Sequence, residues 1–315
     1  MIKLRREIIF VLGFVAIASM LFLVGFGNRA FAYGESSVVE GLALWKAVLL
    51  GITEGLTEFL PISSTGHLLA AKEFMDLGQT EVSEQAIDSY IIAIQIGAIF
   101  AILVLYKSRI VQMYEGIRGN SVEGKIVLRN LISAFIPTGI IGFLLSEPVK
   151  DQLYDSQSVA YAWIVGGICI LVAHNKKWLR NDGLTIETLG FQGAILVGIA
   201  QALALWPGVS RSLVTILALL ALGLSIRAAV EFSFLLGLVT LSAATVYELS
   251  QEGGTIIDVF GYGTPLVGLV SAFLSAMISV KWMVAWLERK SFTVFGFYRI
   301  VVGVLALVLV ASDVL

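Results

Sequence analysis

The stretch EGLTEFLPISSTGH, residues 54–67, interrupts an apolar run from Ala43 to Leu69 with a proline and several hydroxyl side chains. A second apolar run, Gly190 to Leu222, is interrupted in the same way by WPGVSRS, residues 206–212. Irregular backbone at membrane depth is tolerated only where protein encloses it. Both stretches therefore predict re-entrant helix-loop-helix hairpins rather than full membrane spans.

The rest of the chain has the composition of a membrane protein. Hydrophobic residues make up 58% of the 315 residues and charged residues only 14%, which lies outside the range of soluble domains. The net charge of -2 excludes a basic surface for nucleic acid, so no nucleic-acid partner is expected. Six more apolar stretches are long enough to cross a bilayer, and they cover residues 90–106, 127–145, 159–173, 229–249, 266–286 and 292–310. The predicted fold is an all-α polytopic membrane protein.

The two interrupted runs also resemble each other. Residues 47–64 align without gaps on residues 194–211, with identities that include Gly51 with Gly198 and Ser63 with Ser210. We predict a duplicated unit of one hairpin and three spans, with repeats at about 41–175 and 188–313 of a single membrane domain, 41–315. An odd number of spans inverts the second copy. Chance similarity between Leu-, Gly- and Ala-rich segments is the alternative.

Lys and Arg mark the loops that we expect in the cytoplasm. They concentrate in residues 107–129, 176–180 and 289–290, whereas acidic residues predominate at 147–155 and 248–258. The first hairpin would then enter from the outer side and the second from the cytoplasm, so their tips would meet near the midplane. Residues 1–40 form a leader that is either a cleaved signal peptide or an additional transmembrane helix.

The first hairpin carries carboxylates, hydroxyls and a histidine. Glu54 and Glu58 are four residues apart and therefore share a helix face. Carboxylates inside a membrane are costly, so a cation between them is favoured over purely structural pairing. Ser63 or Ser64 is placed to cap the second half-helix, which directs free backbone N–H groups at the tip. His67 lies three residues after Ser64, on the same face.

The second hairpin carries a guanidinium that fits phosphate. Arg211 needs an anionic partner at membrane depth, and its fork binds phosphate oxygens in a bidentate manner. An ion pair with Glu54 or Glu58 is the alternative partner, and both roles can coexist. The predicted phosphate-binding residues are Arg211, Ser210, Ser63, Ser212 and Thr215.

Carboxylates beside a diphosphate require a bridging cation. Glu54 and Glu58 are hard oxygen ligands, which suit Mg²⁺ or Ca²⁺ held between the protein and phosphate oxygens. Two helix N-termini, an arginine, hydroxyls and a histidine in a water-poor space indicate phosphoryl transfer. The predicted cofactor is thus a divalent cation.

These motifs resemble the undecaprenyl-diphosphate phosphatase family, also called the bacitracin-resistance family. The resemblance covers about residue 42 to the C-terminus and rests on Glu54-x-x-x-Glu58, PISSTGH at 61–67 and PGVSRSLVT at 207–215. It implies hydrolysis of undecaprenyl diphosphate to the monophosphate and phosphate, which recycles the lipid carrier for cell-wall synthesis and confers bacitracin resistance. It also implies a divalent cation, the bacterial inner membrane and a site open to the periplasmic or outer side.

By position, Glu54, Glu58, Ser64, His67 and Arg211 match the functional residues of that family. We interpret Ser64 as the nucleophile and His67 as its general base, with Glu54 and Glu58 as cation ligands or as residues that orient His67. A phosphorylated His67 and a water activated by Glu58 remain open. Because broken helices in inverted repeats are typical of transporters, a polyprenyl-phosphate flippase is the competing function. The sequence leaves a homodimer open.

Overall fold

The computed structural model describes residues 42–78, 80–179, 182–287 and 291–312. These residues are almost entirely helical, with one isolated bridge between Leu184 and Leu224. The prediction of an all-α protein is confirmed. The leader predicted at 1–40 lies outside the described residues.

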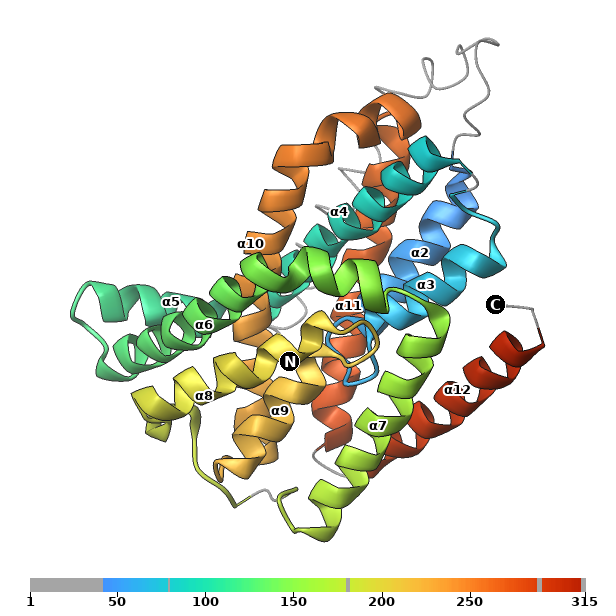
Figure 1. The fold of residues 1–315 in the computed structure, drawn as a ribbon. Coiled ribbons are helices and arrows are strands. Elements are labelled where there is room, and N and C mark those ends of the chain that lie inside the picture. Colours follow the sequence, from blue (N-terminus) through green and yellow to red (C-terminus); the bar gives the residue numbers. More distant parts are fainter. Residues whose placement is uncertain (1–41, 79, 180–181, 288–290, 313–315) are drawn as a thin grey trace.

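Six helices are long and apolar enough to cross a membrane, and they coincide with the six predicted spans (Figure 1). They are α4 (Glu81–Leu105), α6 (Val122–Leu153), α7 (Ser156–Asn175), α10 (Ile226–Phe260), α11 (Gly263–Leu287) and α12 (Thr293–Ala311). Two of them, α6 and α10, run to 32 and 35 residues and extend well past the apolar core that hydropathy detects. The loop expected around residues 107–121 contains a helix, α5 (Lys107–Ile117), which packs against the start of α6.

Both interrupted runs form the expected hairpins. The first consists of α2 (Leu44–Thr57) and α3 (Ser64–Phe74), and the second of α8 (Phe191–Gln201), the short η2 (Ala202–Leu205) and α9 (Arg211–Ala221). Each helix has at most 14 residues, too few to span a bilayer that needs about 20. The short 3-10 helix η1 (Ile186–Thr188) precedes the second hairpin.

The same turn starts the second helix of each hairpin. Ser63 and Ser210 have φ values of 72° and 74°, which non-glycine residues rarely adopt. Each serine also caps the helix that follows it, since the Ser63 hydroxyl accepts from the Gly66 N–H at 3.5 Å and the Ser210 hydroxyl from the Leu213 N–H at 3.3 Å. The serines aligned by sequence therefore share one conformation.

The two halves of the chain exchange contacts reciprocally. Helix α2 packs against α11 and helix α8 against α6, while α4 lies against α10 and α7 against α12. Each hairpin thus rests on a span from the other half, which holds the two tips together. This pairing suits a duplicated unit, and the inverted repeat itself stays a prediction.

Glycines allow the hairpins to approach these spans closely. A Cβ at Gly55 in α2 would overlap the Ala272 carbonyl and the Ser275 hydroxyl of α11. A Cβ at Gly198 in α8 would overlap the Ala134 carbonyl of α6. Small residues at helix interfaces are how membrane helices pack without a hydrophobic driving force.

We expect Gly55→Ala to lower the free energy of unfolding by at least about 1–3 kcal/mol, because the methyl group forces α2 away from α11. The measurement is the melting temperature in detergent. The matched control is Gly139→Ala in α6, where an added Cβ meets only the Phe135 ring at 3.6 Å. Equal melting temperatures for the two variants would contradict close packing at Gly55.

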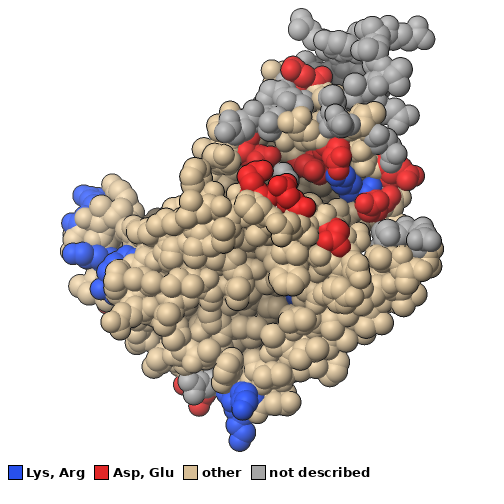
Figure 2. All heavy atoms as spheres, in the orientation of Figure 1, with Lys and Arg blue, Asp and Glu red and all other residues tan. Residues whose placement is uncertain are grey.

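Charge separates the ends of the molecule. Figure 2 shows most Asp and Glu gathered at one end and Lys and Arg at the tip of α5 and α6. The opposite end carries Lys and Arg with a few acidic side chains, and a broad uncharged band lies between the ends. At the acidic end Lys72 is paired with Glu84 at 3.2 Å and Asp88 at 2.9 Å. The distribution follows the loop charges from which the topology was predicted.

Candidate active site

The tips of the two hairpins meet inside the helix bundle. The Ser212 hydroxyl of the second hairpin donates to the Leu60 carbonyl of the first at 2.8 Å. Beside this contact the Arg211 Nη2 lies 3.1 Å from the Glu58 Oε1. The fold therefore brings together residues that are about half the chain apart.

Glu58 is the centre of this junction. It is 7% exposed, and its Oε1 is paired with Arg211. Its Oε2 accepts a short hydrogen bond from the Ser64 hydroxyl. One carboxylate thus touches both the predicted phosphate clamp and the predicted nucleophile.

Glu54 is the residue that fits a metal ion. Its side chain is fully buried, and neither carboxylate oxygen has a hydrogen-bond partner among the described residues. An anion in that state is costly unless a cation compensates it. The described residues contain no group of three or more His, Cys, Asp or Glu that could hold a metal. Two carboxylates, Glu54 and Glu58, are nevertheless sufficient protein ligands for Mg²⁺, which takes one or two carboxylates and completes its shell with phosphates and water.

Arg211 keeps part of its binding capacity free. Its Nη1 donates to the Ser233 carbonyl at 3.3 Å, while its buried Nε has no partner. The guanidinium lies 5.7 Å from the Phe59 ring centroid and directly against Gly237, where a Cβ would overlap it. The ion pair that the sequence left as an alternative is therefore formed, with a donor still available for phosphate.

His67 has different partners from those expected. Its Nδ1 donates to the Ser63 carbonyl at 2.6 Å, because a carbonyl only accepts, and its Nε2 therefore accepts from the Tyr298 hydroxyl at 2.7 Å. No hydrogen bond joins it to Ser64 among the described residues. Helix phase put Ser64 and His67 on one face, but the loop at 58–63 folds back and brings Glu58 to the Ser64 hydroxyl instead.

The remaining predicted phosphate ligands are buried in the walls of the hairpins. Ser63 and Ser210 act as helix caps, and Ser212 is bonded to Leu60. The Thr215 hydroxyl donates to the Arg211 carbonyl at 2.8 Å and accepts from Gln201 at 3.1 Å. These contacts shape the tips, and direct phosphate contacts for these four residues stay a prediction.

Arg299 in α12 is a central residue to which sequence reasoning gave no role. Its side chain is fully buried and donates to the Ala162 carbonyl at 2.8 Å and the Trp163 carbonyl at 3.3 Å in α7. It also donates to Gly208 at 2.9 Å and Pro61 at 3.3 Å, one carbonyl in each hairpin loop. The sequence did offer one signal for a buried role of Arg299, namely a lone arginine within an apolar span.

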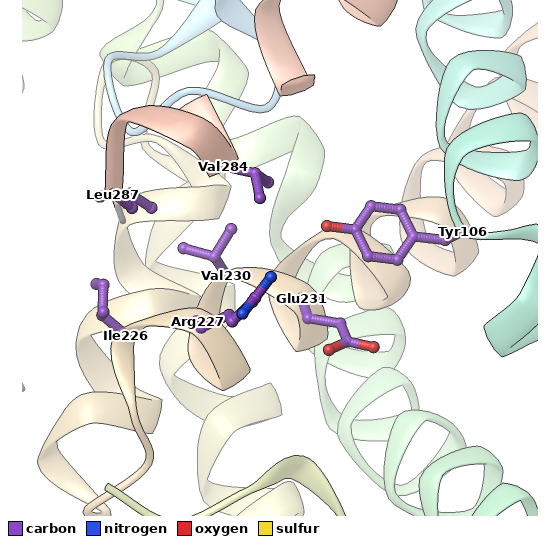
Figure 3. A pocket seen from close by; sticks show the side chains of 7 residues that line it. All are labelled: Tyr106, Ile226, Arg227, Val230, Glu231, Val284 and Leu287. Carbon is purple, nitrogen blue, oxygen red and sulfur yellow. The ribbon is translucent and has the colours of Figure 1, made fainter. Parts of the chain in front are cut away.

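A cavity between the end of α4, the start of α10 and the end of α11 carries none of this chemistry. Its volume is 460 Å³. Figure 3 shows Tyr106, Arg227 and Glu231 among the side chains that line it, together with apolar ones. Glu231 accepts from the Arg109 Nε at 2.7 Å, and the Arg109 Nη1 donates to Glu187 at 2.8 Å. These ion pairs join α5, η1 and the start of α10 away from the hairpin tips.

Comparison with known proteins gives the family. The model of the family "Bacitracin resistance protein BacA" matches residues 47–305, which include both hairpins and every predicted site residue. The chain belongs to the BacA family. An undecaprenyl-diphosphatase of Aquifex aeolicus is 39% identical over 263 residues, 82% of this chain and 95% of the relative. One from Wolinella succinogenes is 41% identical over 268 residues, 84% of this chain and 97% of the relative.

Proposed function

We propose that the protein hydrolyses undecaprenyl diphosphate to undecaprenyl phosphate and phosphate, and so recycles the lipid carrier of cell-wall synthesis and contributes to bacitracin resistance. The observation that carries the proposal is that Glu58 contacts both Arg211 and the Ser64 hydroxyl. The buried Glu54 on the same helix has no hydrogen-bond partner among the described residues. The names of the BacA-family relatives support the same reaction.

The geometry favours Glu58 as the proton acceptor for Ser64. In this version the Ser64 oxygen attacks the terminal phosphorus and its proton passes to the Glu58 Oε2. The bond from phosphorus to the bridging oxygen breaks, undecaprenyl phosphate leaves, and water then hydrolyses the phosphoserine. His67 acts as base only if the Tyr298 hydroxyl releases its Nε2.

Glu54 and Glu58 would hold the proposed divalent cation. When bound, such an ion neutralises phosphate oxygens that two carboxylates would otherwise repel. Arg211 would bind the terminal phosphate through its free Nε and turn partly from Glu58 to do so. These assignments rest on the buried oxygens of Glu54 and the donor set of the site.

The site would open toward the periplasmic or outer side of the inner membrane. The separation of acidic and basic ends in Figure 2 supports this orientation, because cytoplasmic segments are enriched in Lys and Arg. The headgroup of a lipid would then enter from the acidic side of the molecule.

The test is phosphate release from undecaprenyl diphosphate by purified protein, with and without EDTA. We expect EDTA to abolish release and Mg²⁺ or Ca²⁺ to restore it, because the buried Glu54 oxygens have no hydrogen-bond partner among the described residues. Glu58→Ala should lose at least about 10²-fold in kcat, as expected when proton transfer is removed. No release by folded wild type with any cation would move the proposal to a polyprenyl-phosphate flippase.

Comparison of the single variants Ser64→Ala and His67→Ala in the same assay identifies the nucleophile. Ser64→Ala should remove release if Ser64 attacks phosphorus, and acid quenching of the wild type should then trap phosphoserine. Near-normal turnover of Ser64→Ala with loss in His67→Ala would instead exclude Ser64 as the nucleophile. A trapped phosphohistidine would then identify His67, and the absence of any trapped phosphoprotein would identify water.

A further inference from the structure

An apolar groove of 420 Å³ lies between the first hairpin and helices α11 and α12. One wall comes from the end of α2 and the loop after it, and the other comes from α11 and α12. Its volume lies within the range of sites that bind small apolar molecules. The residues that define its walls are Leu56, Leu60, Ile278, Trp282, Val294 and Tyr298.

The groove borders the predicted active site through Tyr298. Tyr298 lines it and is 41% exposed, while its hydroxyl is bonded to the His67 Nε2 at 2.7 Å. Thr57 and Leu60 line it on either side of Glu58, whose carboxylate contacts Arg211 and Ser64. A molecule with its phosphates at Arg211 would therefore meet the groove with the next part of its structure.

We infer that this groove holds the isoprene units next to the diphosphate of the lipid substrate, an inference that rests on the proposed function. The groove leads from Tyr298 toward Trp282 and Trp286, near the end of α11. That end precedes the basic residues 289–290, which we predict to be cytoplasmic. A lipid whose headgroup enters from the outer side would thus direct its tail inward along the groove.

The groove replaces the tail contacts that aromatic side chains in the sequence suggest. Phe59, Phe232 and Phe234 are fully buried and inaccessible to a tail. Trp206 is exposed but does not line the groove. Tail recognition therefore falls to the groove, most of whose lining residues come from α11 and α12, outside both sequence motifs.

The groove would favour catalysis by packing against the tail and orienting the substrate, not through the hydrophobic effect. Lipid tails are as apolar as the groove, so transfer of an isoprene unit from bilayer to groove gains little by itself. A tail packed in the groove does restrict the diphosphate to one orientation beside Glu58 and Arg211, which lowers the entropy cost of reaching the transition state. Filling the groove should therefore affect turnover of prenylated substrates.

The experiment uses a farnesyl diphosphate with a photoreactive diazirine on its first isoprene unit, bound to the full-length protein and mapped by mass spectrometry. We expect crosslinks within residues 278–286 and 294–298 and their loss in Val294→Trp, which fills the groove. The control is Val304→Trp on the same helix; both valines face outward, at 40% and 47% exposure, but Val304 does not line the groove.

Kinetics give the second readout. Val294→Trp should lower kcat/KM for farnesyl diphosphate about tenfold, the size of effect expected for lost pocket contacts, whereas Val304→Trp should not. Crosslinks confined to other helices, or equal kinetics for the two variants, would overturn the inference. Failure of the proposed function looks different, because the wild type would then release no phosphate from any substrate.

Discussion

Arg211→Met should abolish phosphate release, with a loss of at least about 10³-fold in kcat/KM. Arginines that stabilise a transferring phosphoryl group contribute rate factors of this size. Arg211 has a free buried Nε beside Glu58, so it is poised to bind a phosphate that also reaches Ser64. The measurement is phosphate release from undecaprenyl diphosphate under the conditions that are optimal for the wild type.

Arg211→Met would also leave Glu58 buried without its cationic partner, which costs about 3–5 kcal/mol. Two further variants separate this loss of stability from the loss of chemistry. Arg211→Lys retains the charge beside Glu58 and should stay folded, yet lose at least about 10²-fold because an ammonium cannot bind bidentately. The double variant Arg211→Met with Glu58→Gln removes both charges and should recover the melting temperature without recovering activity. Near-normal activity of Arg211→Lys would contradict the bidentate clamp.

Arg299→Met should destabilise the junction of the two hairpins and thereby remove activity. Arg299 is the only donor to the loop carbonyls of Pro61 and Gly208 among the described residues, and each buried carbonyl left unpaired costs about 1–3 kcal/mol. We expect the free energy of unfolding to fall by about 2–6 kcal/mol for the two carbonyls together. The measurement is thermal unfolding in detergent, followed by phosphate release from any folded fraction.

The control for Arg299 is Arg118→Met in α5. The Arg118 side chain is 58% exposed and lies 3.9 Å from Glu115, a surface pair whose loss changes stability by less than about 1 kcal/mol. The two active-site arginines should also differ from each other, because Arg211→Lys stays folded and inactive while Arg299→Met loses the fold. A stable, active Arg299→Met would show that the hairpin loops need no such donor.

The local features of this protein follow from its sequence. Span length is set by bilayer thickness, so hydropathy located all six long helices. Proline with nearby hydroxyl side chains interrupts both apolar runs, so both hairpins were predicted, and Ser63 and Ser210 start their second helices at equivalent turns. Proline alone is no such signal, because Pro137 lies inside α6. The motifs at 54–67 and 207–215 also contain Glu54, Glu58, Ser64 and Arg211, which the fold gathers at one junction.

Tertiary structure alone decided which of these side chains touch. Helix phase paired Ser64 with His67, but the loop returns Glu58 to Ser64 and leaves His67 to Tyr298, 231 residues away. Arg299 was unassigned because its partners are backbone carbonyls, which every residue carries and which no side-chain pattern marks. The groove likewise exists only where α11 and α12 meet the first hairpin. The sequence indicates which secondary structure each segment forms by itself. Which side chains contact each other, and what shape a cavity takes, depend on distances between segments that only packing sets.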